Sequence, residues 1–292
     1  MSYIITADSA ANLTNEFIKE NHIAVINLSL HTETGEPFSD FCEADGYKSF
    51  YNKLRQGLLF KTAQINPQSY SNFFMPFLSA SQDILYISMS SGISGSLASA
   101  HIAAKQLKSE FPERKIVIID SLGASLGIYE IILRAIELQN NNYDIDTAAE
   151  NLKTLVPRIM QIFTVGDLMH LRHSGRISTP AAVFGTALGI KPILKGNEDG
   201  KIVICGKTRG RKGVLTALAK KYADLYFKES TLPVCISHCD SESDALTLKN
   251  MLRDINPTAN ILTLAHEPTT AVHLGPDALA LYFEGESDVR TK

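Results

Sequence analysis

The stretch Ser88-Met89-Ser90-Ser91-Gly92-Ile93-Ser94-Gly95-Ser96 constrains this chain more than any other. It follows an apolar run over residues 84–87 and precedes a helical pattern over residues 97–107. Glycines allow backbone N–H groups to crowd toward one point, and the first turn of a helix adds unpaired donors with a partial positive charge. The serine hydroxyls are further donors. A strand that ends in this way favours an anion-binding site.

Short apolar runs alternate with helical patterns along the chain, which is typical of an α/β fold. A chain of 292 residues favours two domains, which we place at residues 1–157 and 158–292. We expect a mostly parallel open sheet with helices on both faces in the first, and a mixed or antiparallel sheet in the second. Strands are expected at 3–6, 24–30, 84–88, 116–120, 161–165, 201–204, 232–238, 260–264 and 279–283, and helices at 13–20, 46–56, 68–80, 97–107, 126–139, 147–155, 180–188, 213–226 and 241–253.

Charge and hydropathy argue against several classes of protein. The formal net charge is −3, so nothing indicates a nucleic-acid partner. The N-terminus lacks the features of a signal peptide, and no apolar run approaches the about 20 residues that span a bilayer, so we expect a cytoplasmic protein. Its cysteines, at positions 42, 205, 235 and 239, should then stay reduced. Two of them flank His238, but a lone Cys-x3-Cys is a weak zinc signal, and we expect no metal site.

Three expected strands of the first half end in hydroxyl or acidic residues. Asp8-Ser9 follows the first strand, the 88–96 stretch follows the third, and Asp120-Ser121 follows the fourth. Ligands of open parallel sheets bind beyond the carboxyl ends of the strands, so these residues would gather in one crevice. Alternatively, each Asp or Ser only caps the next helix. The sequence leaves both interpretations open.

Basic residues and histidines supply the remaining candidates. Arg172 and Arg176 flank a glycine turn, and guanidinium groups suit carboxylate or phosphate. The basic cluster at residues 207–212 suits a phosphorylated ligand, an acidic partner or an anionic membrane surface. Both segments are also consistent with solvated loops. The common phosphate-loop, dinucleotide and nucleophile-elbow motifs do not occur, although Ser94 and His273 remain a possible nucleophile and base for a serine hydrolase or acyltransferase.

Six elements, in this order, resemble the bacterial DegV family over nearly the whole chain. They are Asp8-Ser9, Thr62-Ala63-Gln64, residues 90–96, Asp120-Ser121 with Ser125-Leu126-Gly127, residues 168–177, and His273-Leu274-Gly275-Pro276-Asp277. The resemblance implies two α/β domains that hold one long-chain fatty acid between them. It implies a lipid-binding subunit, not an enzyme by itself, which serves a separate kinase subunit. That subunit would use ATP to convert the bound acid to an acyl phosphate for phospholipid synthesis, with no cofactor other than the fatty acid.

Carried over position by position, the resemblance also implies roles for individual residues. The carboxylate would be bound by Thr62, Ser94, Gly95 and His273. The head-group rim would include Ser125, Arg172 and Arg176, and Arg209 would dock the kinase subunit. The chain departs from the family pattern at Ala63, Ser96, Ser174 and Asp277, where the family has Ser, Thr, Gly and Gly. Asp277 would matter most, because a carboxylate near His273 would raise the pKa of that imidazole.

A fatty acid has two ends with opposite requirements. Its tail gains about 0.8 kcal/mol for each buried methylene, whereas its carboxylate cannot be buried unpaired. The hydroxyls of Thr62 and Ser94, backbone donors near Gly95, and a protonated or donor-tautomer His273 would satisfy the carboxylate. Neutral hydroxyls would also leave it nucleophilic. The tail would lie against apolar residues of the second domain, whose preference for chain length and unsaturation the sequence leaves open.

Overall fold

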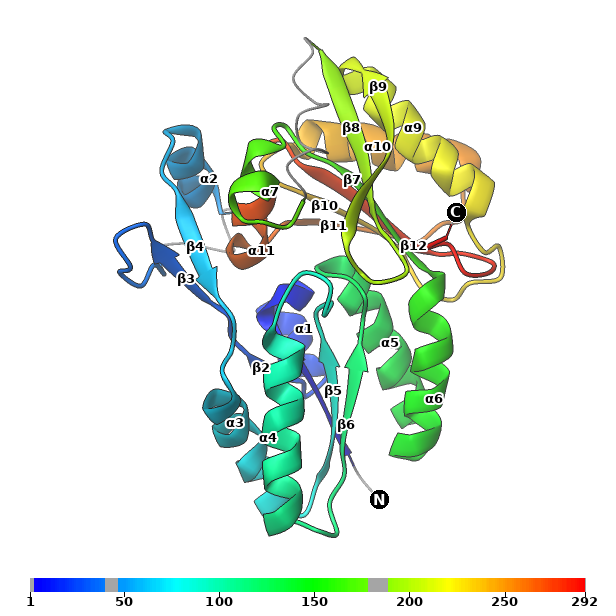
Figure 1. The fold of residues 1–292 in the computed structure, drawn as a ribbon. Helices are drawn as coiled ribbons and strands as arrows, with labels where there is room; N and C mark the ends of the chain where they lie inside the picture. Colours follow the sequence, from blue (N-terminus) through cyan, green and yellow to red (C-terminus); the bar gives the residue numbers. More distant parts are fainter. Residues whose placement is uncertain (1–2, 40–46, 178–188, 292) are drawn as a thin grey trace.

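The computed structural model describes residues 3–39, 47–177 and 189–291. Two lobes, each built around a β-sheet, lie one above the other (Figure 1). The first sheet is entirely parallel and the second is mixed, so the predicted α/β fold is confirmed. The helix expected at 180–188 and the cysteine at position 42 lie outside the described residues.

The first sheet has the strand order β2-β1-β5-β6. Its strands are β1 (Tyr3–Asp8), β2 (Ala24–Ile26), β5 (Asp83–Ser88) and β6 (Ile116–Asp120). Two pairs of helices cover its opposite faces, α3 (Pro67–Ser79) with α4 (Ser96–Glu110), and α5 (Leu126–Asn140) with α6 (Ile145–Leu155). Since both faces are buried, the central strands are continuous apolar runs, which is why they could be predicted.

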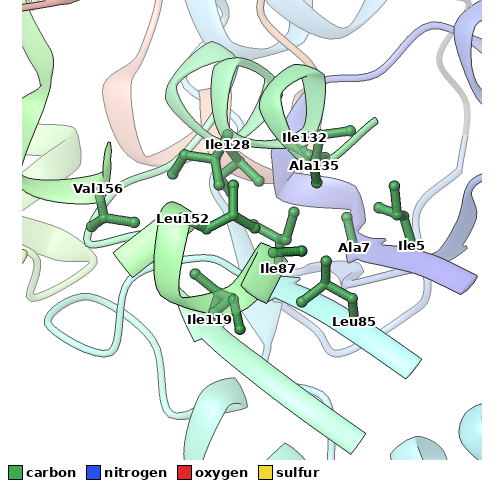
Figure 2. Close-up of a cluster of buried hydrophobic side chains, with 14 of the residues drawn as sticks. Ile5, Ala7, Leu85, Ile87, Ile119, Ile128, Ile132, Ala135, Leu152 and Val156 are labelled. Atoms are coloured by element: carbon green, nitrogen blue, oxygen red, sulfur yellow. The ribbon is translucent and has the colours of Figure 1, made fainter. Parts of the chain in front are cut away.

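Alternate residues of the central strand β5 contribute to two separate cores. Leu85 and Ile87 pack with Ile128 of α5 and Leu152 of α6 (Figure 2). Tyr86, on the other face, packs in the core beneath α3 and α4. Full burial of such a side chain stabilises the fold by about 1.5–3 kcal/mol. Packing in these two cores holds β5 in place, and with it the loop that follows the strand.

The second sheet has the order β11-β10-β12-β7-β8-β9, with only β10 and β11 parallel. Its strands are β7 (Ile159–Thr164), β8 (Ile190–Gly196), β9 (Ile202–Arg209), β10 (Val234–His238), β11 (Ile261–Ala265) and β12 (Leu279–Glu284). One face packs against α9 (Gly210–Leu225) and α10 (Glu242–Ile255). On the other face, Ala280 and Tyr282 pack with Leu126, the first residue of α5. This inner face therefore points toward the first lobe.

One segment of the first half of the chain leaves its own lobe and packs on the second. It comprises β3 (Ser29–Thr32), α2 (Lys48–Arg55) and β4 (Phe60–Ala63). It contacts the short helices α7 (Met169–His173) and α11 (Pro268–Leu274) (Figure 1). Aromatic side chains dominate this contact, with Phe50, Tyr51 and Phe60 buried. The end of this segment, just before α3, therefore lies between the two lobes.

Some elements differ from the sequence predictions. The strand expected at 24–30 divides into β2 and β3, which belong to different sheets. Strands β4 and β8 and the helices α7 and α11 were missed as separate elements. The remaining elements are η1 (Ser9–Ala11), α1 (Asn15–Glu20) and η2 (Val156–Arg158). Across the described ranges, no helix combines the length and apolar character that a bilayer crossing requires.

Candidate functional site

The strand ends of the first sheet are joined by two aspartates. Asp8 accepts hydrogen bonds from Met89 N (2.9 Å), from Tyr86 Oη (3.0 Å) and from Ala10 N (3.1 Å). Asp120 accepts from Leu122 N (2.9 Å) and weakly from the backbone of Ser91. Burial raises the pKa of Asp8 to about 6, although its three hydrogen bonds oppose that shift. Asp8 caps η1, as the second interpretation expects, and it also holds the loop after β5 through Met89 N. Of the three strand ends, only the 88–96 stretch contributes residues to the cavity described next.

A cavity of about 650 Å³ lies beyond these strand ends, between the two lobes. Pockets for small molecules usually measure about 300–1,000 Å³, so it is large enough for a long, narrow ligand. Both lobes supply apolar walls, which include Leu28, Met89, Ile93, Leu122, Phe163 and Ile202. We call this the interlobe cavity. Its polar residues form two groups, described below.

Most of the predicted site residues line the interlobe cavity. These are Thr62, Ser94, Gly95, Ser125, Arg176 and His273. They come from β4, the loop after β5, the start of α5, the turn after α7, and α11. By contrast, Arg172 and Arg209 are exposed and do not line the interlobe cavity. The structure therefore brings together residues more than 200 positions apart, such as Thr62 and His273.

The first polar group, which we call the hydroxyl end, consists of Thr62, Ser94, Gly95 and His273. Thr62 Oγ1 lies 2.9 Å from His273 Nε2. If Nε2–H donates to the threonine oxygen, the hydroxyl proton of Thr62 stays free for an acceptor in the cavity. In that tautomer, the hydroxyl end holds a donor that a ligand oxygen can take without breaking a contact within the protein.

Ser94 and Gly95 are fixed by the start of α4. Ser94 Oγ accepts from Ser96 N (3.2 Å) and donates to Ser96 Oγ (3.0 Å). The hydroxyl of Ser96 also accepts from Ile65 N (3.2 Å), so it ties the loop after β5 to the segment after β4. A Cβ at position 95 would overlap the side-chain oxygen of Gln64. Glycine here allows the amide of Gln64 to approach the helix N-terminus closely.

His273 is neutral in this structure, which corrects one expectation. Burial, with Arg176 and His170 nearby, lowers the pKa of its imidazole to about 3. Asp277 does not counteract this, because its carboxylate lies 2.8 Å from Arg55 Nη2. The expected rise in the pKa of His273 is therefore wrong for this structure, and so is its protonated form. In the neutral ring, either Nε2–H donates to Thr62 Oγ1 or the Thr62 hydroxyl donates to Nε2.

A second cavity, of about 510 Å³, adjoins the hydroxyl end. It shares Thr62, Ser174, Arg176 and His273 with the interlobe cavity. Its other residues include Lys61, His170 and His173, so its walls are rich in basic groups. Desolvation lowers the pKa of the half-buried Arg176 guanidinium. We call this the basic cavity; it brings Lys61 and Arg176 close to the hydroxyl end, and Glu33 also lines it.

The second polar group of the interlobe cavity, which we call the Gln161 wall, consists of Ser125, Gln161, His266 and Tyr282. Gln161 Oε1 accepts from Ala124 N (3.1 Å). His266 Nδ1 lies 2.9 Å from Ser237 Oγ, which lies 3.1 Å from Tyr282 Oη. Neither Gln161 nor Tyr282 could be assigned a role from the sequence, because a polar residue inside a strand pattern gives little signal.

The geometry does not support a serine hydrolase. Among the hydrogen bonds of the described residues, none joins Ser94 to His273. The imidazole contacts Thr62, and Ser94 contacts Ser96. A nucleophile of this class needs a base within hydrogen-bond reach. The arrangement is instead one of donors around a cavity.

Comparison with known proteins identifies the relatives of this chain. The family model described as an uncharacterised protein of the DegV family matches residues 2–286. A DegV domain-containing protein of Clostridium perfringens is 30% identical over 285 residues, which cover 98% of each chain. A solved DegV lipid binding protein of Thermotoga maritima is 25% identical with a TM-score of 0.85, covering 99% of this chain and 100% of its own. The fatty acid binding DegV family protein of Streptococcus agalactiae, at 23% identity, also has a TM-score of 0.85, with coverage of 98% and 100%.

Proposed function

Because this chain belongs to the DegV family, we propose that it binds one long-chain fatty acid in the interlobe cavity. The observation that carries this proposal is the combination of apolar walls and a cluster of hydroxyl donors in one cavity of about 650 Å³. Solved relatives include lipid and fatty acid binding proteins with the same fold. The acyl chain would gain about 0.8 kcal/mol for each methylene that these walls remove from water.

The carboxylate would lie at the hydroxyl end. With the His273 proton on Nε2, Thr62 would offer the ligand a hydroxyl proton that its contact with the ring leaves free. Ser94 can turn its proton from Ser96 Oγ toward the ligand and still accept from Ser96 N. Hydrogen bonds to a charged partner each contribute about 1.5–3 kcal/mol, which offsets the desolvation of the carboxylate. Arg176, half-buried beside His273, adds favourable potential.

We propose further that the protein presents this carboxylate to a separate, ATP-dependent kinase subunit. A carboxylate oxygen would attack the γ-phosphorus of ATP, the bond from phosphorus to the ADP oxygen would break, and the acyl phosphate would form. Neutral hydroxyls leave the attacking oxygen more nucleophilic than a buried ion pair would. The basic cavity supports this role, because exposed Lys61 and His173 line its walls next to the hydroxyl end.

The kinase subunit would dock on the exposed basic cluster at the start of α9. Lys207, Arg209 and Lys212 are exposed there, whereas Arg211 donates to Asp244 Oδ2 (2.7 Å) and is engaged within the protein. Exposed basic groups that steer an acidic surface act mainly on the rate of encounter. The same cluster suits transient contact with an anionic membrane surface.

Native mass spectrometry of the protein purified from bacterial cells tests fatty acid binding. The expected spectrum shows one added mass per chain, which organic extraction identifies as a long-chain fatty acid. After delipidation, added palmitate or oleate should restore that mass. Repeated preparations without lipid, together with no uptake of either acid, would contradict the proposal. A Thr263→Val protein, altered outside the cavity, serves as a control for handling.

A further inference from the structure

We propose that the turn between β8 and β9 is the gate through which the acyl chain enters and leaves the interlobe cavity. This inference rests on the proposed function, because it names the part of the same cavity that opens when a fatty acid exchanges. The turn spans residues 196–202, and we call it the hairpin tip. It reaches from the second lobe to the loops that follow β5 and β6 in the first lobe (Figure 1).

The hairpin tip forms part of the cavity wall. Three of its residues line the interlobe cavity, namely Gly196, Gly200 and Ile202. The first-lobe loops that it meets contribute Gly92 and Leu122 to the same cavity. The outermost residues of the tip, 198 and 199, are exposed to solvent. Displacement of the tip toward solvent would therefore open the cavity between the lobes.

The contact that closes this side of the cavity is small. Among the described residues, one hydrogen bond joins the hairpin tip to the first lobe, from Ser90 Oγ to Gly200 O (2.9 Å). Beside it the lobes meet backbone to backbone, because a Cβ at Gly92 would lie 2.5 Å from Asp199 O. A Cβ at Gly200 would likewise lie 2.0 Å from Ser90 Oγ. The two glycines permit this close approach, and neither carries a side chain that opening would expose to water.

Other contacts between the lobes hold the molecule together while the tip moves. In the first lobe, Asn12 Oδ1 accepts from Glu267 N of the second (2.9 Å). The buried Arg290 donates from Nη1 to Leu122 O (2.6 Å). A Cβ at Gly196 would lie 2.8 Å from this Nη1, so the guanidinium lies at the base of the tip. Arg290 thus fixes the point from which the tip bends.

The pairing of the hairpin also favours bending there. In the described part of the second sheet, β8 pairs with β9 over Ile190–Gly196 but with β7 only at residues 194 and 195. The pairing register with β9 shifts between Ile193 and Leu194, as in a β-bulge, and a bulge bends a hairpin locally. The tip is therefore the end of a two-stranded ribbon, attached to the sheet near its bend.

A gate predicts a particular change in the rates of fatty acid exchange. The Ser90 hydroxyl lies outside the lining of the interlobe cavity, so its bond to Gly200 stabilises the closed protein equally with and without ligand. Loss of this bond should raise the open population about fivefold, equivalent to about 1 kcal/mol. Association and dissociation should then accelerate together, and the affinity should stay nearly constant. Damage to the binding site would instead accelerate dissociation alone.

Stopped-flow exchange of the fluorescent fatty acid cis-parinaric acid on the delipidated protein measures both rates. Ser90→Ala removes the contact from the first lobe. Asn197→Ala loosens the turn in the second lobe, because Asn197 Oδ1 accepts from Asp199 N (3.1 Å) and from Lys201 N (2.8 Å). In each variant both rates should rise about three- to tenfold, with Kd within twofold of the parent. Gly206→Ala is the matched control: it lies in the same hairpin, its Cβ would meet the nearest atom at 3.6 Å, and both rates should stay within twofold.

Three outcomes would overturn the inference. Unchanged rates in both Ser90→Ala and Asn197→Ala would show that exchange does not pass the hairpin tip. Faster dissociation with unchanged association would indicate a weakened site instead of a gate. An effect confined to Ser90→Ala would belong to the loop before Ser94, since Ser90 Oγ also accepts from Gly92 N (3.0 Å). If neither cis-parinaric acid nor oleate binds the parent protein, the proposed function itself fails, which is a distinct result.

Discussion

The two polar groups of the interlobe cavity differ in how their hydrogen bonds are used. At the hydroxyl end, Thr62 and Ser94 each have a partner inside the protein, and each can redirect a proton toward a ligand. At the Gln161 wall, Gln161 Nε2 and His266 Nε2 are buried without a described partner. The first arrangement tolerates an empty cavity, because its groups satisfy one another. The second arrangement leaves two nitrogen atoms enclosed by the protein, almost without exposed surface.

Charge distinguishes the two groups as well. The hydroxyl end adjoins Arg176 and the basic cavity, whereas the Gln161 wall consists of neutral groups. An anionic head group is therefore favoured at the hydroxyl end over the Gln161 wall. The comparison teaches that a single cavity can orient an anionic ligand when only one of its two polar groups adjoins basic residues. Changes at the hydroxyl end test this difference directly and should have the largest effect, whereas changes at Glu130, Arg209 and Asp277 concern groups that do not line the interlobe cavity.

Removing both hydroxyls at the hydroxyl end should have the largest effect. Thr62→Val with Ser94→Ala deletes two donors to a charged partner, each worth about 1.5–3 kcal/mol. The affinity for oleate should fall by about a hundredfold or more, since about 1.4 kcal/mol corresponds to tenfold. Isothermal titration on delipidated protein measures it. The methyl ester of oleate is the control: its weaker binding should change little, and an equal loss for acid and ester would contradict carboxylate recognition.

Glu130, which does not line the interlobe cavity, should make the stability of the folded protein depend on pH. Within residues 3–39, 47–177 and 189–291, this buried carboxyl of α5 has no oxygen or nitrogen atom as a hydrogen-bond partner, and it lies near the thiol of Cys235. Burial, and secondarily Glu284, raises its pKa well above 4.5. The folded protein therefore retains a proton that the unfolded chain loses, and stability should fall by up to about 1.4 kcal/mol per pH unit above that value.

Glu130→Gln should remove this part of the pH dependence. Urea unfolding from acid to mildly alkaline pH measures the free energy of unfolding of both proteins. The variant should gain stability relative to the parent as pH rises. Asp8 and Glu267, whose pKa values are also raised by burial, contribute equally to both curves and cancel in the difference. Parallel curves would show that Glu130 is ionised in the folded protein.

Arg209→Ala should leave fatty acid binding unchanged but impair presentation of the bound carboxylate to the kinase subunit. The guanidinium lies outside both cavities, so affinity for oleate should stay within twofold. Acyl phosphate formation with the kinase subunit should slow by about tenfold, as expected when a docking charge is lost. Lys228→Ala, also in the second lobe but away from the basic cluster, is the matched control. Unchanged turnover in the Arg209 variant would reject the docking role.

The smallest effect is expected at Asp277. Asp277→Gly restores the residue of the family pattern and relieves a φ of +65° that favours glycine. It also removes an exposed ion pair with Arg55, worth about 0–1 kcal/mol, so the two effects on stability largely cancel. Oleate affinity should change less than twofold, measured as for the double variant. A larger change would mean that Asp277 acts on His273 after all.

Much of the fold could be predicted because its central strands are buried on both faces. Runs such as residues 84–87 have a strong apolar signal, and the strand predicted at 84–88 matches β5 to within one residue. The errors fall where tertiary contacts decide. The apolar run at 24–30 crosses from one sheet to another, and α7 and α11 are too short for a periodic signal. The positions of α7 and α11 depend on their packing against the aromatic side chains of Phe50 and Phe60.

The candidate site could be predicted only where a loop motif carries it. Ser94 and Gly95 were found from the turn between β5 and α4, and Thr62 and His273 from the family resemblance. Nothing local marks Gln161, which looks like an ordinary strand residue until Gly123 and Gly127 are seen to pack on its amide. The neutral state of His273 was also out of reach, since it depends on burial and on Arg176.

A crystal structure of the protein with oleate tests the central claim most directly, because it shows the direction of the ligand. We expect carboxylate oxygens within hydrogen-bond distance of Thr62 Oγ1 and Ser94 Oγ, with the chain running past Phe163 toward the Gln161 wall. A carboxylate bound at Gln161 and His266, or a chain that lies outside the interlobe cavity, would contradict this account.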